Sequence, residues 1–201
     1  MSRLAVPLPP APTRLDWRAL FPRPVTDLWL EVGFGAGEHV VWQAEHHPDI
    51  GFIGCEPFVN GVGSLLTEID RGAIDNIRIH AEDARQVIDA LPVASVGRCF
   101  VLFPDPWPKA RHHRRRFVRP DNLDALARIL KDGADLRLAS DHAGLVDWML
   151  YYTRRHGAFR WTARRAADWR GRPPDWPPTR YESKALHGPP VFLTFRRQPR
   201  R

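Results

Sequence analysis

Short apolar runs alternate along the chain with longer segments in which apolar residues recur every three or four positions. The short runs have the length of strands, and the longer segments have the periodicity of helices. This alternation favours a doubly wound α/β fold, with a mostly parallel twisted sheet and helices on both faces. The expected strands are 28–32, 52–55, 76–80, 99–103, 134–139 and 191–195. Five helices are expected. The first follows the first strand and ends near 46, and the next two cover 58–70 and 84–91. The fourth extends from a cap at Asp121 to 130, and the fifth from 141 or 142 to 155.

Both ends of the chain depart from this pattern. Residues 1–24 begin with several closely spaced prolines, which interrupt the apolar segment that a secretory signal needs. We expect a disordered leader there, followed by a single domain over 25–201. Residues 160–201 form a basic C-terminal segment of that domain. Within it, 164–179 is expected to be irregular and 191–195 to form an antiparallel edge strand.

Length and composition are those of one globular domain. The chain has 201 residues, 43% hydrophobic and 26% charged, which is enough to bury a core. No stretch approaches the roughly 18 apolar residues of a membrane span, and we expect a cytoplasmic location. Two cysteines, Cys55 and Cys99, are too few for a disulfide scaffold or a zinc cluster. Both lie in apolar runs, so we expect core positions for them and no metal.

Charge is distributed unevenly along the chain, whose formal net charge is +7. Residues 151–201 hold 13 basic and 3 acidic side chains, whereas residues 1–150 hold 17 basic and 20 acidic ones. This asymmetry indicates a polyanionic partner, with nucleic acid as the first candidate. An arginine-rich surface without any partner would give the same composition, so charge alone does not decide between them.

The segment LEVGFGAGEH follows an expected strand and opens a helix. Its glycines, Gly33, Gly35 and Gly37, are typical of a turn whose backbone approaches a ligand closely. A dinucleotide fingerprint requires glycine or alanine where this chain has Glu38, and Glu31 is a poor neighbour for a pyrophosphate. An acid there suits a cationic ligand, and S-adenosylmethionine carries a sulfonium and an ammonium. An ordinary strand–helix turn is the alternative.

Two further acids stand where adenosine is recognised in such folds. Glu56 ends the second expected strand, 19 residues after Gly37, and is placed for the ribose hydroxyls. Asp83 follows the third strand and is placed for the adenine edge, with Ala84 beside the ring. The alternative for Asp83 is an N-cap of the helix over 84–91.

The segment FPDPWPKARHHRRRFV carries the most specific pattern in the chain. Asp105 stands between Pro104 and Pro106 at the carboxyl end of the fourth strand, where open α/β sheets bind ligands. The prolines restrict the backbone, so Asp105 and Trp107 are expected in a rigid turn. Trp107 is suited to stack on a flat base, and Asp105 is suited to accept hydrogen bonds from its N–H groups.

A basic run follows this turn. Residues 109–119 contain six Lys or Arg, two His and no acid. Beside a proline-flanked acid, such a run favours phosphate binding over a merely solvated surface. His112 and His113 have no cysteines or clustered acids at ligand spacing, so we interpret them as solvated or phosphate-facing and not as metal ligands.

Taken together, these motifs resemble those of the bacterial tRNA (guanine-N7-)-methyltransferase family, from about residue 28 to 197. Two mild departures are Arg180 and Tyr181, where the family has Lys and Phe, and the segment after them matches only loosely. The matched motifs are EVGFGAG, GCEPFVNGVGSLL, FPDPWPKARHHRRR, the SDH segment 140–142 and TRYE at 179–182.

The resemblance implies a Rossmann-like class I methyltransferase that moves a methyl group from S-adenosylmethionine to N7 of the guanosine at position 46, in the variable loop of tRNA. We therefore expect tRNA as the partner, no membrane association and no obligate protein partner, in a monomer or a homodimer. The resemblance makes Asp105 the catalytic residue. The implied donor-binding residues are Glu31, Gly33, Gly35, Gly37, Glu56, Asp83, Ala84 and Asp105. The implied substrate-binding residues are Lys109, Asp141, Thr179, Arg180, Tyr181 and Glu182, and the implied RNA contacts are Arg111, His112, His113, Arg114, Arg115 and Arg116.

Three other interpretations stay open on the residues alone. A methyltransferase of the same fold acting on another RNA base or on a protein would normally carry Asn, or a second proline before an aromatic residue, where this chain has Asp105-Pro106-Trp107. An RNA-binding module without catalysis would not need the full set of acids. An NAD-linked enzyme is disfavoured by Glu38 and by the lack of a residue placed for hydride transfer.

Overall fold

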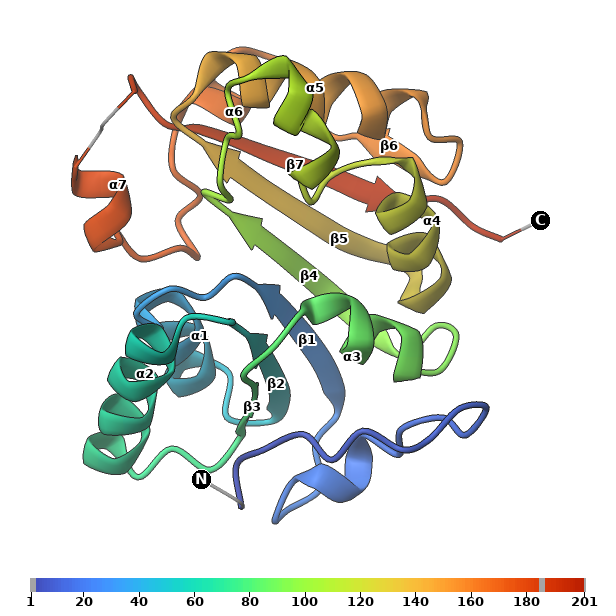
Figure 1. Cartoon of the computed structure of the whole chain (residues 1–201), viewed down its shortest axis with the longest axis vertical. Helices are drawn as coiled ribbons and strands as arrows, with labels where there is room; N and C mark the ends of the chain where they lie inside the picture. Colours follow the sequence, from blue (N-terminus) through green and yellow to red (C-terminus); the bar gives the residue numbers. More distant parts are fainter. Residues whose placement is uncertain (1–2, 185–186, 201) are drawn as a thin grey trace.

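The computed structural model describes residues 3–184 and 187–200, whose strands form a seven-stranded sheet in the order β3-β2-β1-β4-β5-β7-β6 (Figure 1). Strands β1 to β5 are parallel, and β7 is antiparallel to both of its neighbours. The predicted doubly wound fold is therefore confirmed. The strands are β1 (Asp27–Val32), β2 (Ile50–Cys55), β3 (Ile77–His80), β4 (Val96–Leu102), β5 (Leu130–Ser140), β6 (Phe159–Trp161) and β7 (Val191–Arg197).

Helices cover both faces of this sheet (Figure 1). Five of them match the helices predicted from periodicity, whereas the short α6 and α7 lie in the C-terminal segment. They are α1 (Glu38–His46), α2 (Val59–Gly72), α3 (Ala84–Ala90), α4 (Pro120–Ile129), α5 (Ala143–Arg155), α6 (Ala167–Arg170) and α7 (Arg180–Lys184), with the 3-10 helices η1 (Arg18–Leu20) and η2 (Ala110–Arg115).

Side chains of the central strands β1, β2, β4 and β5 alternate between two hydrophobic cores. In β1, Leu28 and Leu30 join the core beneath α3, α4 and α5, while Trp29 joins the core beneath α1 and α2. Burial on both faces explains why the parallel strands are nearly continuous apolar runs in the sequence. Cys55 and Cys99 are buried in the core beneath α3, α4 and α5, as predicted, and burial raises the pKa of both thiols. They therefore act as small core residues.

The prediction of a disordered leader is wrong for residues 3–24. Ala5 forms a parallel bridge with Ile79 of β3, and the leader then crosses the end of the sheet. The prolines exclude a helix, but they do not prevent the apolar residues between them from being buried. Met1 and Ser2 lie outside the described residues. The buried side chains of the leader are Val6, Leu15, Trp17, Phe21.

Two local predictions are corrected. The antiparallel strand β7 is present, but β6 pairs with its outer side and takes the edge; three residues were too short a run to be recognised. Asp121 is not the cap of α4, because that helix begins one residue earlier, with Pro120 at its first position and Arg119 as the N-cap. No helix among the described residues is long and apolar enough to cross a membrane.

Candidate active site

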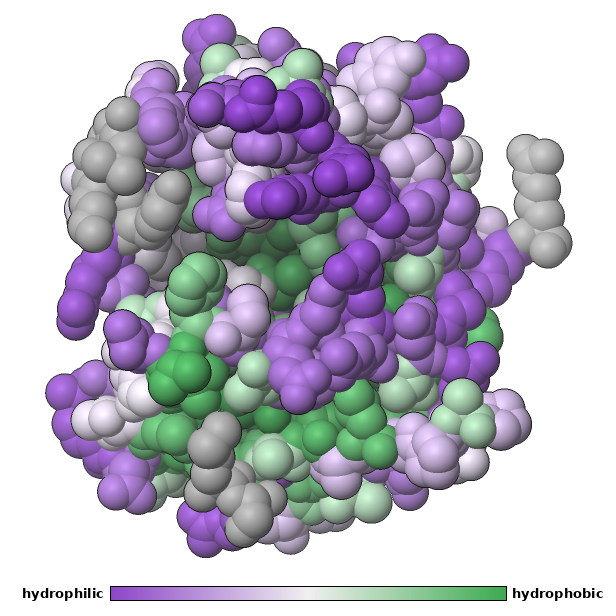
Figure 2. All heavy atoms as spheres, viewed as in Figure 1, coloured by the Kyte–Doolittle hydropathy of each residue, from purple (hydrophilic) through white to green (hydrophobic). Residues whose placement is uncertain are grey.

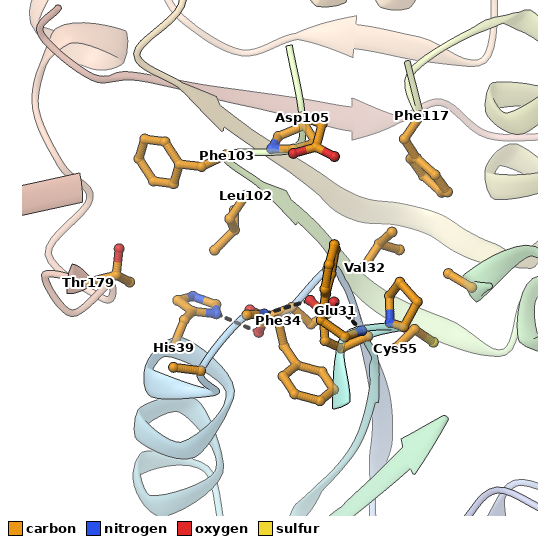
Figure 3. A pocket seen from close by; sticks show the side chains of 18 of the residues that line it. Glu31, Val32, Phe34, His39, Cys55, Leu102, Phe103, Asp105, Phe117 and Thr179 are labelled. Atoms are coloured by element: carbon orange, nitrogen blue, oxygen red, sulfur yellow. Dashed lines mark hydrogen bonds and ion pairs between the residues drawn. The ribbon is translucent and has the colours of Figure 1, made fainter. Parts of the chain in front are cut away.

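The carboxyl ends of β1, β2 and β4 meet at a pocket of about 850 Å³, at the point where the strand order reverses. Figure 2 shows the hollow with hydrophobic walls and a hydrophilic rim, and Figure 3 shows it from close by. The predicted residues that line it are Glu31, Gly33, Gly35, Glu56, Asp83, Ala84, Asp105, Arg115, Thr179 and Arg180. Those outside its lining are Gly37, Lys109, Arg111, His112, His113, Arg114, Arg116, Asp141 and Glu182.

The glycine turn between β1 and α1 has the left-handed backbone that its sequence predicts. Gly33, Gly35 and Gly37 have φ values of 74°, 57° and 90°, which side chains rarely tolerate. A Cβ at Gly33 or Gly35 would meet no atom within 4 Å, so the backbone there faces open space. At Gly37 a Cβ would lie 2.8 Å from Cδ1 of Leu65. The first two glycines therefore leave room for a ligand, and the third allows α1 to pack on α2.

Glu31 is buried at the end of β1, and its carboxylate points into the pocket (Figure 3). Its Oε2 lies 2.7 Å from Nδ1 of the buried His39, in the first turn of α1. Buried carboxylates need such a partner. Glu31 was predicted from the sequence, whereas His39 was not, because its only signal is its place two residues after the last glycine of the turn.

Glu56 holds the turn as well as lining the pocket. Its Oε2 accepts a hydrogen bond of 2.9 Å from the Gly35 amide, and its Oε1 accepts one of 3.0 Å from the Phe58 amide. Each carboxylate oxygen can accept more than one hydrogen bond, so Glu56 keeps acceptor capacity for ribose hydroxyls.

Asp83 combines the two roles that the sequence left open. It is the N-cap of α3, because its Oδ1 accepts from the Arg85 amide at 2.9 Å, and it also lines the pocket beside Ala84. The Arg85 guanidinium donates from Nε to the same carboxylate at 3.0 Å. This side-chain hydrogen bond holds the pKa of Asp83 below its usual value, so its carboxylate stays ionised.

Asp105 lies on a turn with strained backbone on both sides. Phe103 and Trp107 have positive φ values of 48° and 41°. Non-glycine residues in this region cluster at functional sites. Asp105 is exposed, lines the pocket across from Glu31 in Figure 3, and has no hydrogen bond or ion pair with the described residues. Its carboxylate is therefore free to meet a ligand.

Arg116 lies behind this turn. It was predicted to contact RNA, but its surroundings are those of a structural residue. It is buried, donates from Nε to the Pro106 carbonyl at 2.9 Å, and lies 4.8 Å from the centre of the Trp148 ring. Burial lowers its pKa. Its guanidinium is occupied by the fold, so the structure does not place Arg116 as an RNA contact. It holds the Asp105 turn from behind.

The rest of the basic run lies at the surface in η2. Arg111, Arg114 and Arg115 are exposed, and the Arg115 guanidinium lies 4.7 Å from the centre of the Trp107 ring. Lys109, the N-cap of η2, is also exposed. A second hollow of about 470 Å³ adjoins the pocket, and its arginines are Arg85, Arg114, Arg115, Arg116 and Arg119.

His112 and His113 are half-buried against aromatic rings and not clustered with acids. The His112 ring lies 5.9 Å from that of Trp107, and the His113 ring lies 5.2 Å from that of Trp148. In the described part of the chain, no group of three or more His, Cys, Asp or Glu side chains is placed to hold a metal ion.

The C-terminal motif contributes Thr179 and Arg180 to the pocket. Thr179 precedes α7, and its Oγ1 accepts from the Glu182 amide at 3.2 Å, as an N-cap side chain does. The Arg180 amide donates to Glu38 at 2.8 Å, and its Nε pairs with the same carboxylate at 2.8 Å. Glu38 therefore belongs to the site, which sequence reasoning missed.

Two further predicted substrate residues, Glu182 and Asp141, do not line the pocket. Glu182 is buried and pairs with Arg172 at 2.6 Å. Asp141 is buried and accepts from the His187 amide at 3.2 Å. Tyr181 belongs to α7, but its side chain lies outside the described part of the structure. Glu182 and Asp141 thus support the C-terminal segment, and Thr179 and Arg180 reach the pocket.

Comparison with solved structures shows the same fold in distant methyltransferases. An rRNA methylase from Streptococcus thermophilus has a TM-score of 0.57 at 9% identity, covering 86% of this chain and 87% of that one. The 16S rRNA (adenine(1408)-N(1))-methyltransferase from Catenulisporales acidiphilia, solved with its cosubstrate SAM, has a TM-score of 0.57 at 17% identity, covering 88% of each chain.

Comparison with known sequences is more specific. The family described as putative methyltransferase matches residues 26–190. A protein of Rhodospirillum rubrum is 58% identical over 93% of this chain and 74% of its own length, and one of Rhizobium meliloti is 51% identical over 94% and 81%. One of Paramagnetospirillum magneticum is 48% identical over 100% and 84%. All three are named tRNA (guanine-N(7)-)-methyltransferase. The chain therefore belongs to the tRNA (guanine-N7-)-methyltransferase family.

Proposed function

We propose that this protein transfers a methyl group from S-adenosylmethionine to N7 of a guanosine in tRNA, at position 46 of the variable loop. The observation that carries the proposal is that one pocket unites the open glycine turn, three acids at the ends of β1, β2 and β3, and the exposed Asp105. Relatives named tRNA (guanine-N(7)-)-methyltransferase support N7 of a tRNA guanosine as the acceptor. The cytoplasmic location stays a prediction.

The pocket fits the proposed donor in charge and in size. Its volume of about 850 Å³ lies within the usual range of roughly 300–1,000 Å³ for small-molecule sites. Glu31 supplies negative charge beside the glycine turn, where a cationic group would lie. Glu56 and Asp83 supply acceptors for hydroxyl and amino groups. When bound, S-adenosylmethionine supplies an electrophilic methyl group on its sulfonium.

The acceptor atom determines what Asp105 has to do. N7 of guanine carries a free lone pair, so no proton has to be removed before it attacks, and a strong general base is unnecessary. Asp105 accepts hydrogen bonds from the N–H groups of the guanine and so orients it. The same carboxylate stabilises the positive charge that develops on the purine, while Trp107 supports the purine ring. Asp141, which lies outside the pocket lining, acts by holding the segment at His187.

The tRNA backbone would meet the exposed arginines of η2 and the C-terminal motif. Arg111, Arg114 and Arg115 offer guanidinium groups for phosphates beside the base pocket. Lys109 lies at the start of the same surface. Thr179 and Arg180 enclose the pocket from the other side.

The test uses unmodified tRNA transcripts and S-adenosylmethionine labelled in its methyl group. We expect label in N7-methylguanosine after nucleoside digestion, and none when guanosine 46 is replaced by adenosine. Label in another nucleoside, or undiminished labelling of the substituted transcript, would contradict the proposal.

A further inference from the structure

A chain of buried polar side chains connects the donor pocket to the C-terminal segment. It begins at Glu31, whose Oε2 lies 2.7 Å from Nδ1 of His39. Nε2 of that histidine lies 3.2 Å from Nε2 of Gln43, one helical turn farther along α1. The Gln43 amide also donates to the Asp175 carbonyl at 2.7 Å. Glu31, His39 and Gln43 are all buried, so water does not compete for the contacts among these three residues.

The far end of this chain fixes the position of the proton on His39. An amide group next to a backbone carbonyl must present its N–H, so the Asp175 carbonyl determines which way the Gln43 amide points. The second N–H of that amide then faces Nε2 of His39, which has to accept. The ring proton consequently lies on Nδ1 and is donated to Glu31. This arrangement occupies one carboxylate oxygen and leaves the other for a ligand.

Packing holds the imidazole ring in that orientation. The His39 ring lies edge-on to Phe100 with 4.6 Å between the ring centres, and 5.3 Å from the Trp176 ring of the C-terminal segment. Asp175, beside this tryptophan, is fixed by Arg137 at 2.8 Å and by Arg98 at 3.2 Å. Asp175, where this series of hydrogen bonds ends, is therefore held by two arginines of the sheet.

We propose that His39 is the positioning residue of the donor site: oriented by Gln43, it donates to Glu31 and aims that carboxylate at the cationic end of the donor. His39 does not touch the acceptor base and takes no proton in the reaction. The inference rests on the proposed donor, S-adenosylmethionine, but not on the acceptor.

Two substitutions of His39 separate positioning from packing. In His39→Asn the amide nitrogen takes the place of Nδ1, so the donation to Glu31 persists while the contact with Gln43 is lost. In His39→Gln the amide nitrogen takes the place of Nε2, so the donation to Glu31 is lost. We expect His39→Gln to weaken S-adenosylmethionine binding about tenfold or more, and His39→Asn to stay close to wild type.

Isothermal titration with S-adenosylmethionine gives the dissociation constants, and thermal unfolding without donor reports on folding. His46→Asn is the matched control, because His46 is exposed on the same helix and its contacts are local: it hydrogen-bonds the Trp42 carbonyl and stacks on the Trp42 ring. Equal losses of affinity in both His39 variants, or no loss in either, would overturn the proposal. If His39 only filled space, His39→Asn would not bind S-adenosylmethionine more tightly than His39→Gln.

A second comparison tests the role of Gln43. Gln43→Leu frees the imidazole to rotate or change tautomer, so it should weaken donor binding severalfold even though Gln43 does not line the pocket. In the His39→Asn background the same substitution should have no further effect on affinity, since an asparagine amide donates to Glu31 without support from Gln43. Equal effects of Gln43→Leu in both backgrounds would overturn this step.

These titrations are independent of the acceptor. If wild-type protein binds S-adenosylmethionine but methylates another nucleoside, the proposed function fails and the His39 proposal stands. If the donor binds equally to wild type and both variants, the His39 proposal fails while the proposed function stands.

Discussion

At the scale of single residues, Asp105 reaches the pocket because its neighbours are held from behind. Its own carboxylate makes no hydrogen bond or ion pair with the described residues, whereas Arg116 supports the turn that carries it and helps to hold Phe103 and Trp107 in their strained backbone conformations. In the proposed transfer, which needs no base, a fixed turn would hold Asp105 in register with the guanine and so supply much of the acceleration.

Asp105→Ala should reduce the rate of methyl transfer about a hundredfold or more while weakening donor binding much less, because its main interaction forms as charge develops on the purine. Single-turnover assays on tRNA and titration with S-adenosylmethionine measure the two effects. Asp124→Asn is a control at an exposed acid on α4. Parallel losses of rate and donor affinity would refute the assigned role.

Arg116→Ala and Arg115→Ala should differ, although the two arginines are adjacent. Loss of Arg116 leaves the Pro106 carbonyl without its buried donor, which costs about 2 kcal/mol and lowers Tm by about 5 °C. Loss of the exposed Arg115 should leave Tm nearly unchanged and weaken tRNA binding. Thermal unfolding of both variants provides the check, and equal melting temperatures would show that Arg116 does not secure the turn.

At the scale of elements, η2 presents a row of guanidinium groups on one side of the pocket. Arg114→Ala and Arg115→Ala should each weaken tRNA binding and make the plot of log affinity against log salt concentration about one unit less steep. Filter binding at several salt concentrations measures that slope. Arg71→Ala, at the opposite end of α2 from the pocket, is the control. An unchanged slope would argue against phosphate contacts at η2.

The segment between β6 and β7 is fastened to the sheet by Asp175. Burial raises the pKa of this carboxyl, but the hydrogen bond and charge of Arg137 and the charge of Arg98 outweigh burial, so the pKa lies below its usual value. A lowered pKa stabilises the fold at pH values above about 4, the ordinary pKa of Asp, and this contribution is lost as pH falls through the folded value.

Asp175→Asn should therefore lower Tm by about 3 °C at pH 7, since a partly exposed ion pair contributes about 1 kcal/mol. The difference from wild type should shrink as the pH falls below about 4. Thermal unfolding followed by circular dichroism, once near neutral pH and once in acid, measures this. A difference that stays the same under both conditions would exclude the ionised pair as its cause.

The elements that sequence could predict are those with strong periodicity. Strands such as β1 and β4 and the glycine turn were located because burial on both faces and positive φ leave clear marks on residue choice. The three-residue β6 left none. In the site, Glu31 and Asp105 were found because motifs carry them. Glu38 and His39 were missed because their partners, Arg180 and Glu31, are apparent only after folding.

At the scale of the whole molecule, the leader is part of the folded unit. Removal of residues 1–24 takes away four buried apolar side chains and exposes the edge of β3. Each such side chain contributes about 1.5–3 kcal/mol, so the truncated protein should lose a large part of its stability. Urea unfolding and the soluble yield of the truncated chain measure this. Wild-type stability after truncation would mean that the leader packs without contributing.

The place of β7 between β5 and β6 has a consequence for how the molecule is made. A strand that leaves the ribosome later is inserted between two strands synthesised before it, so β6 has no hydrogen-bonding neighbour in the sheet until β7 emerges. The segment that brings Thr179 and Arg180 to the pocket is held at both ends only from that moment. In a nascent chain, β6 therefore joins the sheet, and the far end of this segment is anchored, only after β7 has been translated.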